Sequence, residues 1–286
     1  MTTSTLQRVW LITGASRGFG ARIARAALER GDAVVATARK PEAVTEALGA
    51  HPSLLPVALD VTDETQAQRA VAIALERFGR IDILVNNAGY GLLGAVEEAS
   101  ADEVRRLYET NVFGLLNITR AALPAMRLRR AGRIVNFSSI GAVRAAPGFG
   151  VYSSTKFAVE GLSEALRAEL APLGIHVSSV QPGYFRTDFL DSSSLAVSPA
   201  PIGDYAATAG RVREIARDLS HKQPGNPERL ADAILALVDA PNPPARLPLG
   251  TDTLGAIGQR LAEVARETEQ WRGLASSTDF SEAGIH

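Results

Sequence analysis

Tyr152 and Lys156 lie four residues apart in the run "YSSTKFAVEGL", residues 152 to 162. The run has no proline, and no glycine before Gly161, so it favours a helix with both side chains on one face. Such a pair can be an ordinary solvated tyrosine beside a solvated lysine. It can also perform acid/base chemistry, because a nearby ammonium charge favours the ionised form of a phenol. The rest of the sequence has to decide between these interpretations.

Acid/base chemistry at neutral pH would require a lower pKa than an ordinary tyrosine has. A free phenol titrates near pH 10, and a decrease of about three units corresponds to about 4 kcal/mol in favour of the phenolate. The Lys156 ammonium and the positive end of a helix that begins near Tyr152 both act in that direction. Together with the charge of a bound cationic cofactor, they can supply energy of that order, so we expect the pKa of Tyr152 to fall when such a cofactor is bound.

The elements that must position this pair follow an alternating pattern. Apolar runs of strand length alternate with amphipathic helical stretches, which indicates an α/β fold with a doubly wound parallel sheet and helices on both faces. The expected strands cover residues 8–13, 33–39, 55–61, 81–89, 132–139, 175–183 and a last strand near 245–250, and the expected helices cover 20–31, 64–78, 102–130, 152–173 and 226–240.

The sequence predicts one domain over residues 1–286. A core for cofactor binding and catalysis spans 8–189, and a last core helix and strand span 227–252, with Asn226 as the N-cap and Pro227 at the first helical position. Residues 190–226 change composition, contain a short helical pattern near 204–219 and are too long for an ordinary connection, so they predict a substrate lid. Residues 253–286 predict one helix with a polar tail.

Composition excludes several classes of function. The formal charge is −1 with both signs interspersed, so the sequence predicts neither a nucleic acid nor an anionic membrane as a partner. Cysteine is absent, which removes disulfides and thiolate ligands. The histidines are far apart in sequence, so no metal site is expected. No basic leader or bilayer-length apolar segment occurs, and we expect a cytoplasmic protein. The histidines are His51, His176, His221 and His286.

The run "TGASRGFG", residues 13 to 20, connects the first expected strand to the first expected helix. Glycines at positions 14, 18 and 20 allow a tight turn, and the free N–H groups at a helix N-terminus attract a pyrophosphate. The spacing differs from the general dinucleotide motif, and a plain strand-to-helix turn remains an alternative. Its place in a β-α-β unit favours a bound dinucleotide.

Two arginines distinguish between the two nicotinamide dinucleotides. At the end of the second strand, where an acidic residue would bind the ribose of NAD, the chain has Ala38 followed by Arg39. Arg17 lies in the glycine turn, and two guanidinium groups suit a 2′-phosphate. The sequence therefore predicts NADP(H) rather than NAD(H), unless both arginines are only solvated.

Seven motifs in this order resemble the short-chain dehydrogenase/reductase family. They extend over residues 8 to about 190, and beyond that point the match is only to the general pattern of a branch with 17β-hydroxysteroid dehydrogenase, retinol dehydrogenase-like and carbonyl reductase members. The motifs are "TGASRGFG", "DVT" at 60–62, "NNAG" at 86–89, Asn111, "VNFSS" at 135–139, "YSSTK" and "PGYFRT" at 182–187.

The resemblance implies a Rossmann fold of about seven strands and hydride transfer between NAD(P)(H) and a carbonyl/alcohol pair. It implies that Tyr152 is the general acid/base, that Ser139 rather than Ser138 is the catalytic hydroxyl, and that Lys156 binds the nicotinamide ribose. Asn111 would hold a proton-relay water where its helix bends. The residues implied to bind cofactor are Gly14, Ser16, Arg17, Gly18, Phe19, Gly20, Arg39, Asp60, Val61, Asn87, Ala88, Gly89, Tyr152, Lys156, Pro182, Gly183, Phe185 and Thr187.

Apolar and aromatic residues at strand ends suggest the substrate. If they line one pocket, it takes an apolar or aromatic ketone or aldehyde, although about half of them could be ordinary packing residues. An NADP(H)-binding sensor or scaffold without turnover is the main alternative, and an epimerase or dehydratase is a second. By resemblance, the helices at 102–130 and 152–173 predict a homodimer or homotetramer. The candidate pocket residues are Tyr90, Leu92, Ile140, Phe149, Tyr184 and Phe189.

Overall fold

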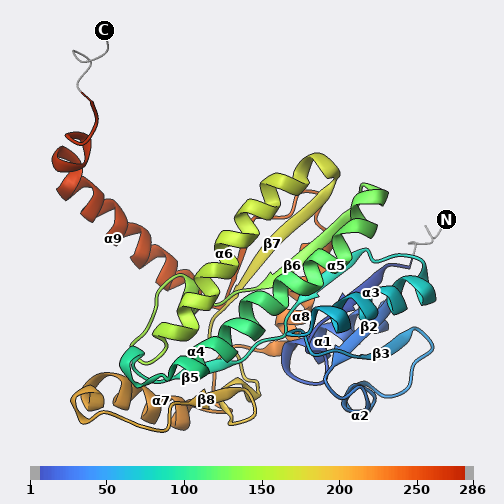
Figure 1. The fold of residues 1–286 in the computed structure, drawn as a ribbon, viewed down its shortest axis with the longest axis horizontal. Coiled ribbons are helices and arrows are strands. Elements are labelled where there is room, and N and C mark those ends of the chain that lie inside the picture. The colour runs from blue at the N-terminus through green and yellow to red at the C-terminus, as the bar shows by residue number, and fades with distance from the viewer. Residues whose placement is uncertain (1–6, 281–286) are drawn as a thin grey trace.

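A computed structural model describes residues 7–280 and shows seven parallel strands in one sheet, in the order β3-β2-β1-β4-β6-β7-β9. The predicted α/β fold is confirmed, and Figure 1 shows the sheet between helices on both sides. The strands are β1 (Val9–Ile12), β2 (Ala33–Ala38), β3 (Leu54–Ala58), β4 (Ile83–Asn86), β6 (Gly132–Phe137), β7 (Ile175–Pro182) and β9 (Arg246–Leu249).

The helices divide into two layers that bury the two faces of the sheet. Apolar side chains of α1 (Gly18–Glu29) and α8 (Pro227–Asp239) pack on one face, with Val44 of α2 (Glu42–Leu48). The opposite face packs against α3 (Glu64–Phe78), α5 (Gly114–Arg129) and α6 (Gly150–Leu170). Because strand order reverses between β1 and β4, the carboxyl ends of the strands open a crevice there, the usual ligand site of such sheets.

Local sequence signals explain several helix ends. The Asp63 side chain accepts the Gln66 amide at 3.0 Å at the start of α3, and Asn226 accepts the Glu228 amide at 2.9 Å at the start of α8. These contacts satisfy donors that have no partner inside their own helix. The cap predicted at Asn226, with Pro227 as the first helical residue, is confirmed.

The expected helix over 102–130 is interrupted in the structure. It consists of α4 (Ala101–Tyr108), a π-helical turn (Glu109–Phe113) and α5, so the predicted bend at Asn111 occurs as a π turn. Three short elements were not predicted: helix α2 and the strands β5 (Gly91–Leu93) and β8 (Leu195–Val197), which pair with each other in parallel. Strands of three residues are too short for their alternation of side chains to be recognised.

The segment from residue 190 to residue 226 contains β8 and helix α7 (Arg211–Leu219). We call it the lid, and its two ends are fixed side by side. Phe185 and Gly225 form a β-bridge, and the Gly225 amide donates to the Tyr184 carbonyl at 2.9 Å. Further along, Arg213 of α7 pairs with the buried Glu98 carboxylate, which also accepts the Ile202 amide at 2.8 Å. The lid is therefore held at both ends and near its centre.

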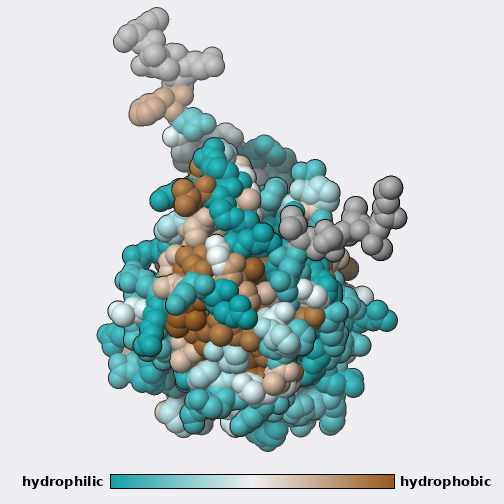
Figure 2. Space-filling view, turned by 90° about the vertical axis from the view of Figure 1, so that its right-hand side faces the viewer, coloured by the Kyte–Doolittle hydropathy of each residue, from teal (hydrophilic) through white to brown (hydrophobic). Residues whose placement is uncertain are grey.

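Helix α9 (Thr251–Ser276) projects away from the sheet. The helix predicted from residue 253 is confirmed through Ser276, whereas the end of the predicted tail, 281–286 with His286, lies outside the described residues. Figure 2 shows hydrophobic residues gathered near the middle of one face of the molecule. Within the described range 7–280, no helix combines the length and apolarity needed to span a bilayer.

Candidate active site

A cavity of about 1150 Å³ lies at the carboxyl ends of the strands and collects most of the predicted site residues. The predicted cofactor residues line it except Gly20, and so do Ser139, Tyr152 and Lys156. Asn111 and Leu92 do not line it. Of the candidate pocket residues, the cavity is lined by Tyr90, Ile140, Phe149, Tyr184 and Phe189.

The glycine turn opens the N-terminus of α1 toward the cavity. Gly14 and Gly18 have φ angles of +65° and +56°, which other residues rarely adopt. A Cβ on Gly14 would lie 3.1 Å from the Ala88 Cα, whereas one on Gly18 would meet no atom within 4 Å. Arg17 precedes the helix and makes no side-chain cap. The N–H groups of the first turn therefore remain available to an anion such as a phosphate.

Gly20 supports this turn from behind. A Cβ there would lie 2.4 Å from the Gly14 carbonyl oxygen, so only glycine fits. The Asn87 side chain donates to the carbonyls of Thr13 and Gly14 at 2.9 and 3.0 Å. These contacts join the end of β4 to the glycine turn and fix the floor of the cavity.

The two arginines expected at the 2′-phosphate have different surroundings. Arg39 follows β2, is exposed and makes no hydrogen bond or ion pair with any residue from 7 to 280. Arg17 donates to the carbonyl of Ser193 and so reaches across the cavity to the lid. The nearby Asp60 carboxylate accepts the amide and hydroxyl of Thr62 at 3.0 and 2.8 Å. Arg39 is thus a guanidinium available to an anionic ligand.

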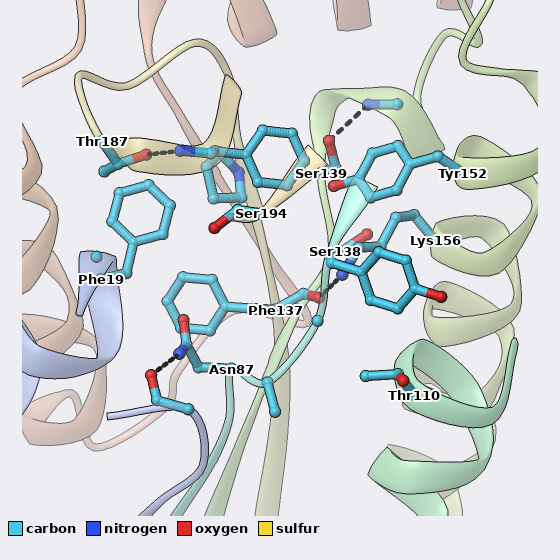
Figure 3. A pocket seen from close by; sticks show the side chains of 18 of the residues that line it. Phe19, Asn87, Thr110, Phe137, Ser138, Ser139, Tyr152, Lys156, Thr187 and Ser194 are labelled. Carbon is cyan, nitrogen blue, oxygen red and sulfur yellow. Dashed lines mark hydrogen bonds between the residues drawn. The ribbon is translucent and has the colours of Figure 1, made fainter. Parts of the chain in front are cut away.

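Tyr152 is the third residue of α6 and is buried in the wall of the cavity (Figure 3). Its ring contacts those of Phe149 and Phe189, with centroid distances of 6.1 and 5.6 Å. Burial raises the pKa of Tyr152 to about 12, while the hydrogen bond with Ser139 acts in the opposite direction. In the protein alone, the loss of hydration therefore outweighs the stabilising contacts. The decrease expected with a cationic cofactor bound stays a prediction.

Lys156 lies one turn further along α6, on the same face as Tyr152. Its ammonium donates to the Phe137 carbonyl at 2.8 Å and lies 5.7 Å from the Tyr152 ring centroid. Burial lowers the pKa of Lys156 to about 8, with a smaller opposing effect from Glu160. Lys156 therefore remains mostly protonated at pH 7.

The two serines that compete for the catalytic hydroxyl follow β6. The Ser139 hydroxyl lies next to the Tyr152 hydroxyl (Figure 3), and its oxygen accepts the Gly141 amide at 3.0 Å. The Ser138 hydroxyl is buried and has no partner among the described residues, although Ser138 also lines the cavity. The geometry thus places Ser139, and not Ser138, against Tyr152.

Asn111 lies behind the cavity, in the π-helical turn. Its side chain accepts the Tyr90 amide at 3.1 Å and donates to the Tyr90 carbonyl at 3.0 Å. It also donates to Thr155 of α6 at 3.2 Å. Asn111 therefore joins the segment after β4 to the helix that carries Tyr152 and Lys156.

Sequence reasoning missed part of the cavity wall. The lining residues that it missed come from α4, the lid, the loop after β6 and the first turns of α9. Nothing in their local sequence indicates that they meet. The structure also brings His221 to 3.0 Å from Asp191, near Asp188, but Asp191 is already bonded to Ser220 at 2.7 Å. The missed lining residues include Arg106, Arg144, Ser193, Ser194, Gln223 and Ala256.

Comparison with known proteins gives consistent matches over the same region. A family model described as short chain dehydrogenase matches residues 8–197. Oxidoreductase BOA17 of Botryotinia fuckeliana is 39% identical over 94% of this chain and 98% of its own length. The 3-ketodihydrosphingosine reductase of Bacteroides thetaiotaomicron is 41% identical over 85% of this chain and 88% of its own length.

Solved structures share the fold and include complexes with nicotinamide cofactors. A short-chain dehydrogenase from Streptomyces avermitilis matches with a TM-score of 0.90 and 42% identity, over 96% of this chain and all of its own. The 3-ketoacyl-(acyl-carrier-protein) reductase of Brucella melitensis, complexed with NADH, has a TM-score of 0.72 and 30% identity, over 85% and 96% of the two chains. A serine dehydrogenase complexed with NADP+ has a TM-score of 0.70 and 28% identity, over 84% and 94%.

Proposed function

This chain belongs to the short-chain dehydrogenase family of oxidoreductases, and from that premise we propose that it is an NADP(H)-dependent enzyme that interconverts a carbonyl compound and a primary or secondary alcohol. The observation that carries the proposal is the contact of Tyr152 with Ser139, with the Lys156 ammonium one helical turn away. These groups face the same cavity as the uncapped N-terminus of α1.

In the proposed reaction, Tyr152 gives its proton to the carbonyl oxygen as the alcohol forms. Its raised pKa keeps the phenol protonated at neutral pH, which is the form that an acid needs. The Ser139 hydroxyl donates a hydrogen bond to the same oxygen and stabilises its developing negative charge. Lys156 contributes positive charge near Tyr152, and Asn111 holds Tyr90 and α6 in position.

NADPH supplies the hydride when it is bound. The α1 N-terminus with Gly14, Gly18 and Phe19 would hold its pyrophosphate, and Arg39 with Arg17 would bind the 2′-phosphate. Asp60 and Val61 would contact the adenine, while Lys156 would bind the nicotinamide ribose. The absence of a described counter-ion around Arg39 supports this preference, and the relatives solved with NADH and with NADP+ support a nicotinamide cofactor of either kind.

We propose an apolar or aromatic ketone or aldehyde as substrate. Phe149, Phe189, Tyr184 and Ile140 line the cavity next to Tyr152, and the lid closes its outer side. The relative named for 3-ketodihydrosphingosine supports carbonyl reduction. We also propose that residues 1–286 act as one domain, with residues 190–226 determining which carbonyl compounds enter.

The direct test follows absorbance at 340 nm with NADPH or NADH and a panel of aldehydes, aryl ketones, diketones and hydroxysteroids. We expect oxidation of NADPH, much faster than of NADH. Tyr152→Phe should reduce turnover by about 10²- to 10⁴-fold and leave NADPH affinity unchanged. Near-normal turnover of this variant would refute Tyr152 as the proton donor, and tight NADPH binding without turnover on any panel member would favour a sensor.

Variants of the cofactor site test the preference for NADPH. Arg39→Ala should weaken NADPH binding by about tenfold or more and change NADH binding little, because only NADPH carries the 2′-phosphate. The control is Lys40→Ala, which removes an adjacent exposed charge that does not line the cavity. Equal effects of Arg39→Ala on the two cofactors would contradict this assignment.

A further inference from the structure

The projecting helix α9 carries an apolar stripe that is largely exposed to solvent. The stripe repeats at alternating spacings of three and four, as in helices that pair side by side. Leu254, Leu261 and Trp271 are 57%, 65% and 59% exposed. We call this stripe the α9 seam, and it consists of Leu254, Ile257, Leu261, Val264, Thr268, Trp271 and Ala275.

The body of the protein contacts only the first turns of α9. Thr253 is buried, Arg144 donates to Gln259 at 2.8 Å, and Glu263 lies 3.7 Å from the same guanidinium. Beyond Glu263, every residue of the helix is exposed, and Figure 1 shows it directed away from the sheet. A row of large apolar side chains on such a helix marks an interaction surface.

The charges beside the seam favour a protein over a lipid surface. From residue 260 to residue 272, α9 carries three arginines and three glutamates on its remaining faces. A helix that lies on an anionic membrane needs a predominantly basic polar face. This balanced pattern instead suits a partner whose charges are arranged in the same way.

We propose that α9 binds antiparallel to α9 of a second copy of this chain. One register aligns every seam residue except Ala275: Leu261 packs against the partner's Val264, Ile257 against the partner's Thr268, and Leu254 against the partner's Trp271. Large side chains meet smaller ones in two of these three layers, which allows close packing. The two-fold symmetry repeats each layer once.

Charge complementarity is consistent with this antiparallel register. Arg260 and Glu267 each precede a seam residue by one position and so flank the contact. In the antiparallel register Arg260 faces the partner's Glu267, and symmetry creates this pair twice. Parallel pairing would place Arg260 against the partner's Ala265 and match only Glu267 with the partner's Arg272. Each arrangement thus forms two opposite-charge pairs, but only the antiparallel one pairs Arg260, so the charge of Arg260 distinguishes the two.

The proposed contact also reaches the catalytic cavity. Ala256 and Arg144 line that cavity, and both lie beside the base of α9. When Leu254 packs against the partner's Trp271, the end of the partner helix lies next to the cavity entrance. Each entrance in the dimer is therefore bordered by the second copy.

Charge reversal tests the register on the full chain by sedimentation equilibrium. Arg260→Glu and Glu267→Arg should each raise the dissociation constant of the dimer about tenfold or more, because each creates two like-charge contacts. The double variant should restore affinity, and so should an equimolar mixture of the two single variants. Glu269→Arg, an equal change on the outer face, is the control and should leave association unchanged.

Cross-linking tests the same geometry independently of any other contact between copies. The chain has no cysteine, so Ile257→Cys and Thr268→Cys introduce the only thiols. A mixture of these two variants should form a disulfide-linked dimer that joins positions 257 and 268. Each of four results would overturn the proposal. The cross-link could fail to form, or Arg260→Glu could leave association unchanged. The protein could be a monomer at 100 µM, roughly the upper range for a weak specific contact, or α9 could bind anionic vesicles instead of a second copy.

Discussion

Replacing Lys156 by methionine should abolish activity and at the same time stabilise the protein. The pKa of Lys156 falls from 10.5 to about 8 because its ammonium is buried. At neutral pH this decrease corresponds to about 3 kcal/mol of destabilisation relative to an exposed lysine. Methionine is of similar length and removes that cost.

The variant also loses one favourable contact. The Lys156 ammonium donates to the Phe137 carbonyl at 2.8 Å, and a hydrogen bond from a charged donor contributes about 1.5–3 kcal/mol. The difference leaves a net gain of about 1 kcal/mol at pH 7. For a chain of this length, the gain corresponds to an increase of about 2 °C in the melting temperature.

The pH dependence separates this explanation from a general packing effect. Between pH 8 and pH 10.5 the unfolded lysine binds a proton that the folded lysine has lost, so the wild-type protein becomes more stable relative to the variant as the pH rises. The advantage of Lys156→Met should therefore shrink between pH 8 and pH 10.5.

Thermal unfolding of the cofactor-free protein at pH 7 and pH 10, followed by circular dichroism, measures both effects. Lys222→Met, at an exposed lysine, is the control and should change neither melting temperature. A Lys156→Met protein that melts below the wild type at pH 7, or whose advantage is the same at both pH values, would refute the reasoning.

Three further predictions concern the site and its supports. Ser139→Ala should lower kcat by about 10²-fold because it removes a donor to the carbonyl oxygen, whereas an equal loss in Ser138→Ala would contradict this assignment. Arg213→Met should raise KM by a larger factor than it lowers kcat and should increase proteolysis within 190–226, since the lid loses its pairing with Glu98. If Glu98→Gln alone leaves KM unchanged, the pair does not position the lid. Asn226→Ala should destabilise the protein by about 1 kcal/mol in chemical denaturation, because α8 loses its cap, and an unchanged midpoint would exclude that contribution.

The sequence predicted the sheet and the edge that carries the candidate site because both depend on local patterns. Alternating strands and helices determine a parallel sheet, and motifs at strand ends must then meet at one edge. The glycine turn, Tyr152 and Lys156 belong to this class, and all of them line one cavity. The cap at Asn226 is likewise a local signal.

The features that the sequence did not predict depend on contacts between segments far apart in the chain and on how deeply a side chain is buried. The pairing of β5 with β8, and the approach of Arg144 to the base of α9, join segments that are far apart in the chain. The raised pKa of Tyr152 in the cofactor-free protein was not predicted, because neighbouring charges can be inferred from spacing, whereas the depth of burial cannot.

The bridge between Phe185 and Gly225 makes the lid an exchangeable unit. The chain leaves the core and returns to it at neighbouring positions, so a replacement lid of different length needs only to span the same short gap. The entropic cost of lengthening such a loop rises slowly, and the strands below it need not move. Exchange of residues 190–226 as a cassette would therefore change the wall of the cavity that this segment forms, while Tyr152 and the glycine turn keep their places.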